Sequence, residues 1–408
     1  MSTLADIVAS TPVDDIHTHL YDPAFGSLLL SGIDDLLVYH YLVSEASRQM
    51  DVSLERFWAA SKTEQADWVW RALFVENSPV SEACRGVVTV LHALGIEPRA
   101  HDLPSLRRWF AAQPPAAYLE RVLALAGVRS VCMTNSPFDD EERPVWEKGF
   151  ERDPRFRAAL RIDPLLLDWP RAMPRLRAWG YDVGPDRSAR TASEVRRFLG
   201  DWTRRIESRY CMVSLPPDFA WPSDTDASWL IQEAVLPHGR ETGQAFALML
   251  GVKRGVNPAL RLAGDGVGRS RLDALENLCA GNPGNRFLAT LLSREAQHEA
   301  VVLARKFPNL HLFGCWWFTN TPQLIDEITR MRLELLGTSF TPQHSDARVL
   351  DQLIYKWRHT RERLVPVLAA RYEALAASGW VVTESEMRRD VARWMGGGFE
   401  AFVGGRTG

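Results

Sequence analysis

The stretch DDIHTHLYDP (residues 14–23) places two histidines, His17 and His19, one residue apart at the end of a short predicted strand. Alternate residues of a strand point to the same side, about 6–7 Å apart, so that two imidazoles can reach one metal ion through bonds of about 2.0–2.1 Å. Two such histidines can also be ordinary polar residues at a strand end. The stretch therefore predicts a strand and leaves two interpretations of its histidines open.

Seven further apolar or β-branched runs follow along the chain, separated by helix-like segments rich in arginine and glutamate. Alternation of strand and helix favours parallel βαβ units, and eight units would close a (β/α)₈ barrel of about 250 residues. We therefore predict an α/β fold with one (β/α)₈ TIM barrel domain over residues 1–408. The eight predicted strands are residues 13–19, 128–134, 156–162, 210–215, 245–251, 286–291, 310–315 and 338–344.

The chain is longer than such a barrel needs, and most of the surplus lies between residues 46 and 120. Segments such as SLERFWAASKTEQADWVWRALF and SEACRGVVTVLHALG have helical spacing and no strand signal. We expect a helical insertion after the first strand. Two roles stay open for it, a cap over the mouth of the barrel and a contact between subunits.

The composition of the 408 residues is that of an ordinary globular protein. The 48 basic and 51 acidic residues give a net charge of -3, with no long run of one sign, so neither nucleic acid nor a membrane surface is an expected partner. The five cysteines are widely spaced without a Cys-x-x-Cys pair, which favours a reducing compartment. With no targeting segment or membrane-spanning run in view, we expect a cytoplasmic protein.

The other end of the chain carries TPQHSDARVLDQ (residues 341–352), in which Asp346 and Arg348 lie two residues apart just past the last predicted strand. In a closed barrel the first and eighth strands are neighbours, so Asp346 would approach an ion held by His17 and His19. Arg348 would enter the same cavity and offer its fork to a carboxylate. The alternative is an Asp–Arg pair in a surface loop.

The segments DIHTHL, VYHYLVSEASR, RIDP, GCWWFTN and SDAR occur in this order along the chain. In this combination the sequence resembles the uronate isomerase (glucuronate isomerase) family of the amidohydrolase superfamily. The resemblance implies a metal-dependent (β/α)₈ barrel of the amidohydrolase type. It also implies interconversion of a hexuronate aldose and its keto form, such as glucuronate and fructuronate. The implied cofactor is one divalent metal ion, with zinc expected.

Residue by residue, the resemblance assigns roles to the following positions. The metal ligands are His17, His19 and Asp346; His40 and Tyr41 lie beside the substrate; Arg161 and Arg348 bind it, and Trp316, Trp317 and Phe318 form the aromatic block after the seventh strand. Each position also has a structural alternative. Tyr41 can pack at a helix start, Arg161 can pair with Asp163 in a turn, and the tryptophans can belong to the core.

Some family features are missing or altered. Strand four reads YCMVSLPP and strand five AFALMLG, without the bridging lysine and metal-binding histidines of two-metal hydrolases, so one metal is expected. Met249 or a neighbour replaces a histidine common in strand five of uronate isomerases, the segment after it reads KRGVNPAL, and the second-strand motif reads MTNSPFDD. The substrate pocket has therefore changed on at least one wall, and substrate identity is less secure than reaction class.

Moving a carbonyl from C1 to C2 of a sugar needs a base for the proton beside the carbonyl and stabilisation of the enediolate. We expect Asp346 to assist opening of the sugar ring and Tyr41 or His40 to carry the proton, with the pKa of Tyr41 lowered by the metal and the arginines. Two alternatives stay open: a mononuclear hydrolase of a sugar lactone or amide, and a barrel without catalytic activity. The expected partners are a small sugar acid and further copies of the chain.

Overall fold

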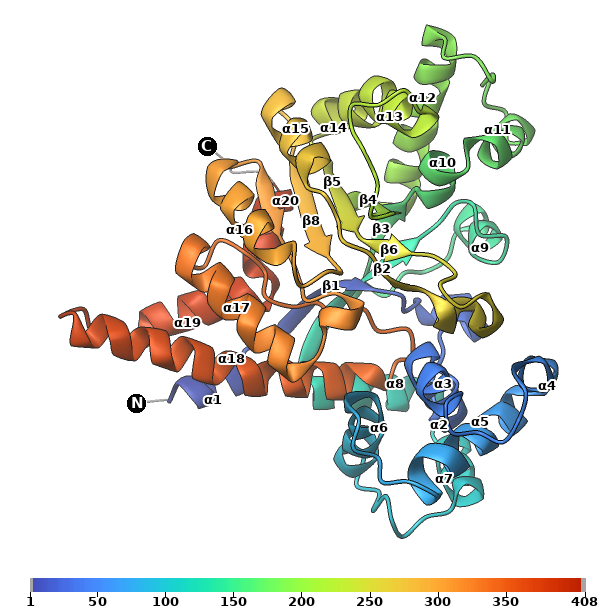
Figure 1. Cartoon of the computed structure of the whole chain (residues 1–408), viewed down its shortest axis with the longest axis vertical. Helices are drawn as coiled ribbons and strands as arrows, with labels where there is room; N and C mark the ends of the chain where they lie inside the picture. Colours follow the sequence, from blue (N-terminus) through green and yellow to red (C-terminus); the bar gives the residue numbers. More distant parts are fainter. Residues whose placement is uncertain (1–2, 405–408) are drawn as a thin grey trace.

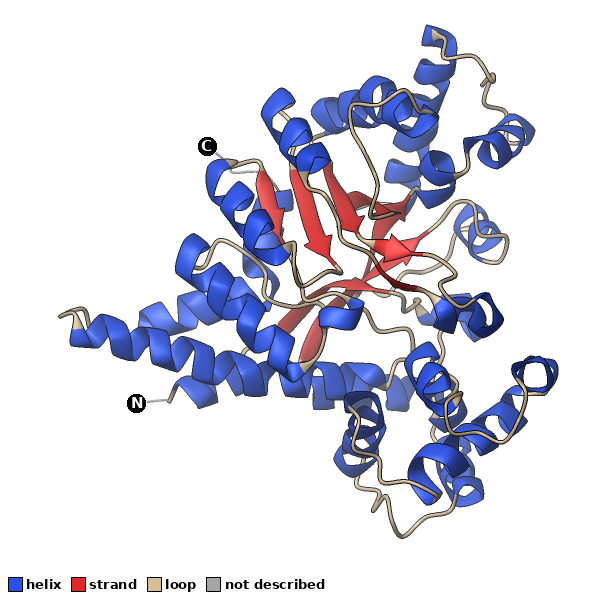
Figure 2. Cartoon of the chain, viewed as in Figure 1, coloured by secondary structure: helices blue, strands red, loops and turns tan. Residues whose placement is uncertain are grey.

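The structure is a computed structural model and describes residues 3–404. Its centre is a curled parallel sheet with helices around it (Figures 1 and 2). Seven strands follow one another in the sheet: β1 Val13–Thr18, β2 Val128–Asn135, β3 Phe156–Arg161, β4 Tyr210–Leu215, β5 Ala245–Leu250, β8 Phe287–Leu291 and β9 Leu310–Leu312. All paired neighbours run parallel. Seven of the eight predicted strands are thus confirmed.

The strands are apolar because both faces of the sheet are covered. Every residue of β4 and β5 is buried, as expected for parallel strands covered on both sides. Alternate residues of β4 enter different parts of the core: Tyr210 and Met212 pack in one cluster, whereas Cys211 and Val213 pack in the larger one. Since successive side chains point to opposite faces, one cluster lies on each face of the curled sheet.

The eighth predicted strand, residues 338–344, is not a strand in the structure. It forms a single parallel bridge, Phe313 with Thr341. Pro342 follows at once and has no N–H for a ladder, and Asp346 has a left-handed backbone with φ of 52°. Pro342 therefore interrupts the predicted strand, and Asp346 turns the chain just after it.

This irregular segment still hydrogen-bonds to both ends of the sheet. On one side Thr341 N donates to Leu312 O of β9 at 3.0 Å. On the other, Asp346 N donates to His17 O at 3.1 Å, and His19 N donates to Ala347 O at 2.7 Å. The distant ends of the chain therefore meet, as the sequence analysis required.

The chain between β1 and β2 is helical. It contains η1 Pro23–Leu28, α2 Ile33–Leu37, α3 His40–Ala46, α4 Leu54–Ala59, α5 Lys62–Trp70, η2 Arg71–Val75, α6 Glu82–Ala93, α7 Leu103–Ala111 and α8 Pro115–Ala126. The predicted helical character of residues 46–120 is confirmed. In Figure 1 the blue and cyan helices α2 to α7 gather at one end of the molecule.

The remaining helices come before β1 and after β2, and most of them cover the outside of the sheet (Figure 2). They are α1 Leu4–Ser10, α9 Glu142–Lys148, α10 Asp163–Leu167, α11 Trp169–Ala178, α12 Ala189–Ile206, α13 Asp226–Leu230, η3 Ile231–Val235, α14 Leu236–Thr242, η4 Pro258–Gly264, α15 Asp273–Gly281, α16 Gln297–Lys306, η5 Trp317–Thr319, α17 Pro322–Leu336, α18 Gln352–Ala377, α19 Glu384–Ala392, η6 Arg393–Gly397 and α20 Gly398–Val403. A short hairpin joins β6 Val252–Lys253 to β7 Gly266–Val267. Within residues 3–404, no helix combines the length and apolar character that crossing a membrane requires.

The long helix α18 connects the irregular segment to the rest of the fold. It packs against α6, α8 and α17. Its first turns are largely buried, and Trp357 Nε1 donates a hydrogen bond of 2.8 Å to Asp15 Oδ2 on β1. The start of α18 is therefore held directly beside the histidines of β1.

The close packing around Gly314 leaves no room for a side chain, so we expect a substitution there to lower the free energy of unfolding. Its φ is +68°, and an added Cβ would lie 1.7 Å from Nδ1 of the buried His344. We expect Gly314→Ala to lower the free energy of unfolding by about 3 kcal/mol or more, from left-handed strain and the clash together. Gly95→Ala is the matched control, since φ is +77° there and nothing lies within 4 Å. It should cost only about 1 kcal/mol. Equal losses of unfolding free energy in the two variants, measured by urea denaturation, would contradict a clash at Gly314.

Candidate metal centre and active site

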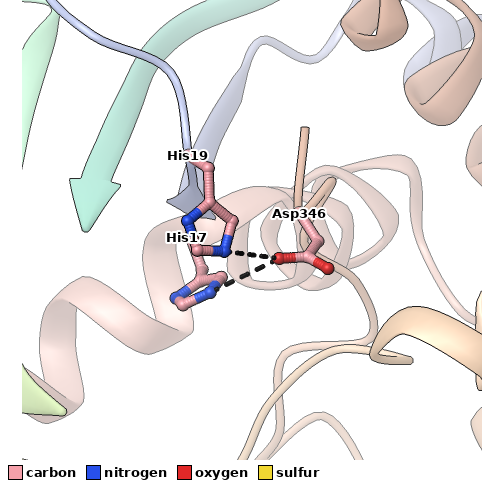
Figure 3. A group of neighbouring side chains, drawn as sticks. All are labelled: His17, His19 and Asp346. Carbon is pink, nitrogen blue, oxygen red and sulfur yellow. Dashed lines mark ion pairs between the residues drawn. The ribbon is translucent and has the colours of Figure 1, made fainter. Parts of the chain in front are cut away.

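Three predicted ligands meet at one end of the sheet (Figure 3). His17 lies on β1, His19 follows the strand directly, and Asp346 lies in the irregular segment. Asp346 Oδ1 is 3.6 Å from His17 Nε2 and 3.3 Å from His19 Nε2. One candidate ligand atom from each residue lies within 4.8 Å of the others. This is a compact group of two nitrogens and one oxygen.

A buried carboxylate fixes the loop that carries Asp346. Asp15 Oδ1 accepts a 3.1 Å hydrogen bond from Ser345 N, while its other oxygen is bound to Trp357. Burial raises the pKa of Asp15 to about 6, and the hydrogen bonds to Ser345 and Trp357 oppose this rise. Asp346 itself has a φ of 52°, a strained conformation for a residue other than glycine. Strand β1 thus positions all three candidate ligands.

Tyr210 of β4 orients the imidazole of His17. The two side chains are joined at 3.0 Å between Nδ1 and the hydroxyl, and that hydroxyl donates its own proton to Ile16 O at 2.9 Å. It can therefore only accept from His17, which places the ring proton on Nδ1. The unprotonated Nε2 of His17 then faces Asp346.

Thr134 of β2 does the same for His19. Its hydroxyl donates to Thr18 O at 3.1 Å and lies 3.0 Å from His19 Nδ1. The hydroxyl must accept from the ring, which leaves Nε2 of His19 unprotonated. Hydrogen bonds of this kind orient and strengthen metal-binding histidines.

The three side chains fit a divalent cation. Burial lowers the pKa of His17 to about 3 and that of His19 well below its ordinary value, so both rings are neutral and ready to coordinate. Within residues 3–404, His17 Nε2 and Asp346 Oδ1 are buried without a hydrogen-bond partner. Two nitrogen lone pairs and a carboxylate oxygen that face one another repel unless a cation lies between them.

His40 and Tyr41 begin α3 and lie close to this group. Their rings are in edge contact, with centroids 4.5 Å apart, and the terminal polar atom of each side chain is buried. His40 Nε2 and the Tyr41 hydroxyl have no hydrogen-bond partner of regular geometry among residues 3–404. The imidazole of His40 and the hydroxyl of Tyr41 are therefore held next to the candidate ligands and can form further hydrogen bonds.

The expected lowering of the pKa of Tyr41 depends on a bound metal, because the protein groups together act in the opposite direction. Burial raises its pKa well above the ordinary value, and the nearby Tyr39 and Asp346 raise it further. Arg348 acts in the opposite direction but does not outweigh them. Burial also lowers the pKa of His40 well below its ordinary value. The pair therefore consists of a protonated phenol and a neutral imidazole.

The two predicted arginines have different surroundings. Arg161, at the end of β3, donates to Asp163 Oδ1 at 2.8 Å, so the expected turn pair is present. For the half-buried guanidinium of Arg348, no hydrogen bond to residues 3–404 is found, although its charge lowers the pKa of His19 and His40. Arg348 is thus the arginine with free donors beside the candidate ligands.

Both tryptophans are buried in the smaller of the two clusters that pack on the sheet, in agreement with their structural alternative. Trp317 contacts His40, with ring centroids 5.3 Å apart and the rings nearly perpendicular, and has a φ of 46°. Since such strain persists only where the surroundings enforce it, Trp317 is the better candidate for a substrate-facing residue.

A cavity of about 280 Å³ is lined by His40 and Tyr41. Trp317 and Lys356 also line it, whereas the three candidate ligands do not. Helix α6 contributes Glu82, Gly86 and neighbouring apolar residues to its wall. The helical segment after β1 therefore contributes to the wall of this cavity.

Four polar residues of this region were not predicted from the sequence. Asp15, Thr134, Tyr210 and Lys356 are all buried, and three of them orient ligands or the loop that carries them. The only signal in the sequence is a polar side chain inside an apolar run, such as Lys356 in QLIYKW. That signal does not say which residue such a side chain contacts.

We expect Tyr210→Phe to weaken metal binding. The substitution keeps the ring but removes the acceptor for His17 Nδ1, so the imidazole loses its fixed tautomer. Affinity for a divalent cation should fall about 10–100-fold, as measured by titration of the apoprotein with Zn²⁺ in competition with a chelator. Tyr181→Phe, which removes a hydroxyl bound to Asp201 elsewhere, should leave the affinity unchanged. An unchanged affinity in Tyr210→Phe would remove this tyrosine from the site.

Comparison with solved structures gives close matches over the whole chain. An uronate isomerase from Bacillus halodurans matches with a TM-score of 0.97 and 51% identity, covering 98% of this chain and 95% of that one. An uronate isomerase from Thermotoga maritima matches with 0.77 and 16%, covering 98% and 96%, and a glucuronate isomerase from Caulobacter crescentus with 0.77 and 17%, covering 98% and 93%.

The two more distant matches show the common fold alone. No family model matches the chain, and no curated protein matches it either. The match to the Bacillus halodurans protein is of a different kind, because half of the residues are identical over nearly the full length of both chains. The chain belongs to the uronate isomerase family.

Proposed function

We propose that this chain isomerises a hexuronate, moving the carbonyl between C1 and C2 as in the conversion of glucuronate to fructuronate. The main support is the juxtaposition of His17, His19 and Asp346 with the buried, unpaired His40 and Tyr41 in a chain of this family. When bound by the three ligands, a divalent ion, for which we propose zinc, supplies Lewis-acid polarisation of the sugar oxygens. The carboxylate of Asp346 also accepts a hydroxyl proton as the sugar ring opens.

His40 and Tyr41 divide the proton transfer according to their protonation states. The neutral imidazole of His40 accepts the proton from C2, because a base must enter the reaction unprotonated. The phenol of Tyr41 holds its proton and delivers it to C1, while the hydroxyl proton of O2 moves to O1. Return of a proton from His40 to Tyr41 restores the pair.

The carboxylate of the uronate binds at the arginines. Arg348 offers free N–H donors in the planar fork that matches a carboxylate, whereas Arg161 already shares one donor with Asp163. We assign the main contact to Arg348 and a supporting one to Arg161. Trp317 packs against the sugar from the cavity side.

We also propose that residues 338–347 act as the eighth member of a closed (β/α)₈ barrel, with residues 46–120 as an insertion after the first strand. Backbone hydrogen bonds to both β9 and β1 support this closure. The five cysteines are unpaired and buried, which supports the proposal of a cytoplasmic location.

The chain is proposed to form a homo-oligomer. Trp380 and Val381, just after α18, are 63% and 75% exposed, an arrangement that favours contact with another molecule. Light scattering should therefore return a multiple of the 46.1 kDa chain mass. A mass of one chain at micromolar concentration would refute self-association.

The assay that tests the function follows metal-loaded protein with a panel of hexuronates and uronolactones, using product NMR in deuterated water. We expect an aldose–ketose conversion with solvent deuterium entering at the carbon that receives the proton. Hydrolysis of lactones without isomerisation would instead indicate a mononuclear hydrolase. The metal-free protein should be inactive and should recover on addition of Zn²⁺.

In the same assay, Tyr41→Phe should lower turnover about 10²–10⁴-fold, because the variant keeps the ring but has no proton to deliver. Its metal content should equal that of the wild type. Tyr372→Phe, which alters a tyrosine bound to Asp390 on α19, is the control and should retain full turnover. Normal turnover in Tyr41→Phe would exclude this residue from the proton transfer.

A further inference from the structure

Lys356 on α18 differs from every other lysine of the chain. The sequence contains five lysines, and the other four, at positions 62, 148, 253 and 306, are exposed. Lys356 is only 4% exposed. Because lysine is almost never buried without a partner, its position requires an explanation.

The ammonium group of Lys356 has no internal partner that satisfies it. No acceptor within residues 3–404 forms a hydrogen bond with Nζ. The group lies 5.8 Å from the centroid of the Tyr41 ring, and the side chain lines the same cavity wall as His40 and Trp317. Lys356 is therefore held beside the proposed proton-transfer pair.

Charged residues of both signs lie near the ammonium group of Lys356. Burial lowers the pKa of Lys356, the nearby anions Asp346 and Asp15 raise it, and Arg348 is the opposing cation. Asp15 already accepts hydrogen bonds from Ser345 and Trp357, and Asp346 belongs to the candidate ligands. When Asp346 is engaged with a cation, Asp15, which is already hydrogen-bonded, is left to compensate the positive charges of Lys356 and Arg348, which is unfavourable in a buried site.

We propose that Lys356 is a further catalytic residue, which donates a charged hydrogen bond to a sugar oxygen at the C1–C2 end of the substrate. Its position over Tyr41 favours the reacting end, whereas Arg348 is available for the carboxylate end. As the C2 proton is removed, negative charge grows on the oxygens of C1 and C2, and a fixed ammonium stabilises that charge more than it stabilises the ground state. This inference rests on the proposed isomerase function.

The test compares Lys356→Met with the wild type, since methionine keeps most of the apolar length and removes the charge and the donors. We expect kcat to fall about 100-fold while KM changes only a few-fold. The kinetic isotope effect on kcat with C2-deuterated substrate should rise, because proton abstraction becomes slower relative to the other steps. Lys62→Met, at an exposed lysine paired with Asp35, is the matched control and should behave as the wild type.

Two further measurements separate this role from a structural one. Metal content should be unchanged in Lys356→Met, and calorimetric binding of glucarate, a hexaric acid without a carbonyl to isomerise, should weaken no more than about threefold. Lys356→Gln, which restores neutral donors, should recover part of the lost kcat. Thermal midpoints of both variants report whether the fold is intact.

Several outcomes would overturn the proposal. These are a kcat equal to that of Lys62→Met, a loss confined to KM and glucarate binding, and unfolding of both variants. An unchanged kcat would exclude a catalytic role for Lys356. A loss confined to KM and glucarate binding would place Lys356 at the carboxylate end of the substrate, and unfolding of both variants would show that Lys356 stabilises the fold. An inactive wild-type chain would instead refute the proposed function itself.

Discussion

The site depends on the backbone pairing between β1 and the residues around Asp346. The hydrogen bonds Asp346 N to His17 O and His19 N to Ala347 O fix the register of two segments separated by more than three hundred residues. A shift of one residue would turn Asp346 away from the histidines, because side chains alternate along an extended chain. Asp15 strengthens this register from the same strand by holding Ser345. The candidate ligands thus depend on one short main-chain contact.

Burial sets the chemistry of the side chains placed by this contact. Neutral histidines and a protonated Tyr41 both follow from exclusion of water. In an exposed site the same residues would be solvated and ordinary. The buried polar groups without hydrogen-bond partners lie together at one place, which is typical of a site that a bound ligand completes.

Much of the fold was predictable because it follows from local apolar patterns. A fully buried strand such as β5 is recognisable as a short apolar run, and seven strands lie close to their predicted bounds. The eighth was not, because Pro342 and the left-handed Asp346 break a pattern that the apolar residues alone suggest. The His-x-His and Asp-x-Arg spacings indicated the ligands and Arg348. The orienting partners Tyr210 and Thr134, like Lys356, depend on contacts between distant strands and helices, which no local spacing encodes.

The helical segment after β1 is linked to the site by more than the cavity wall. Glu82 of α6 lies 3.1 Å from His359 Nδ1 on α18, and the other nitrogen of that ring lies 3.0 Å from Asn320 Oδ1. Gln343 donates to the same Asn320 oxygen at 3.2 Å and accepts from His344 N. A continuous polar chain therefore runs from α6 to the segment that carries Asp346. Movement of α6 would disturb both this series of hydrogen bonds and the cavity. The position of the helical segment is therefore coupled to the position of the segment that carries Asp346.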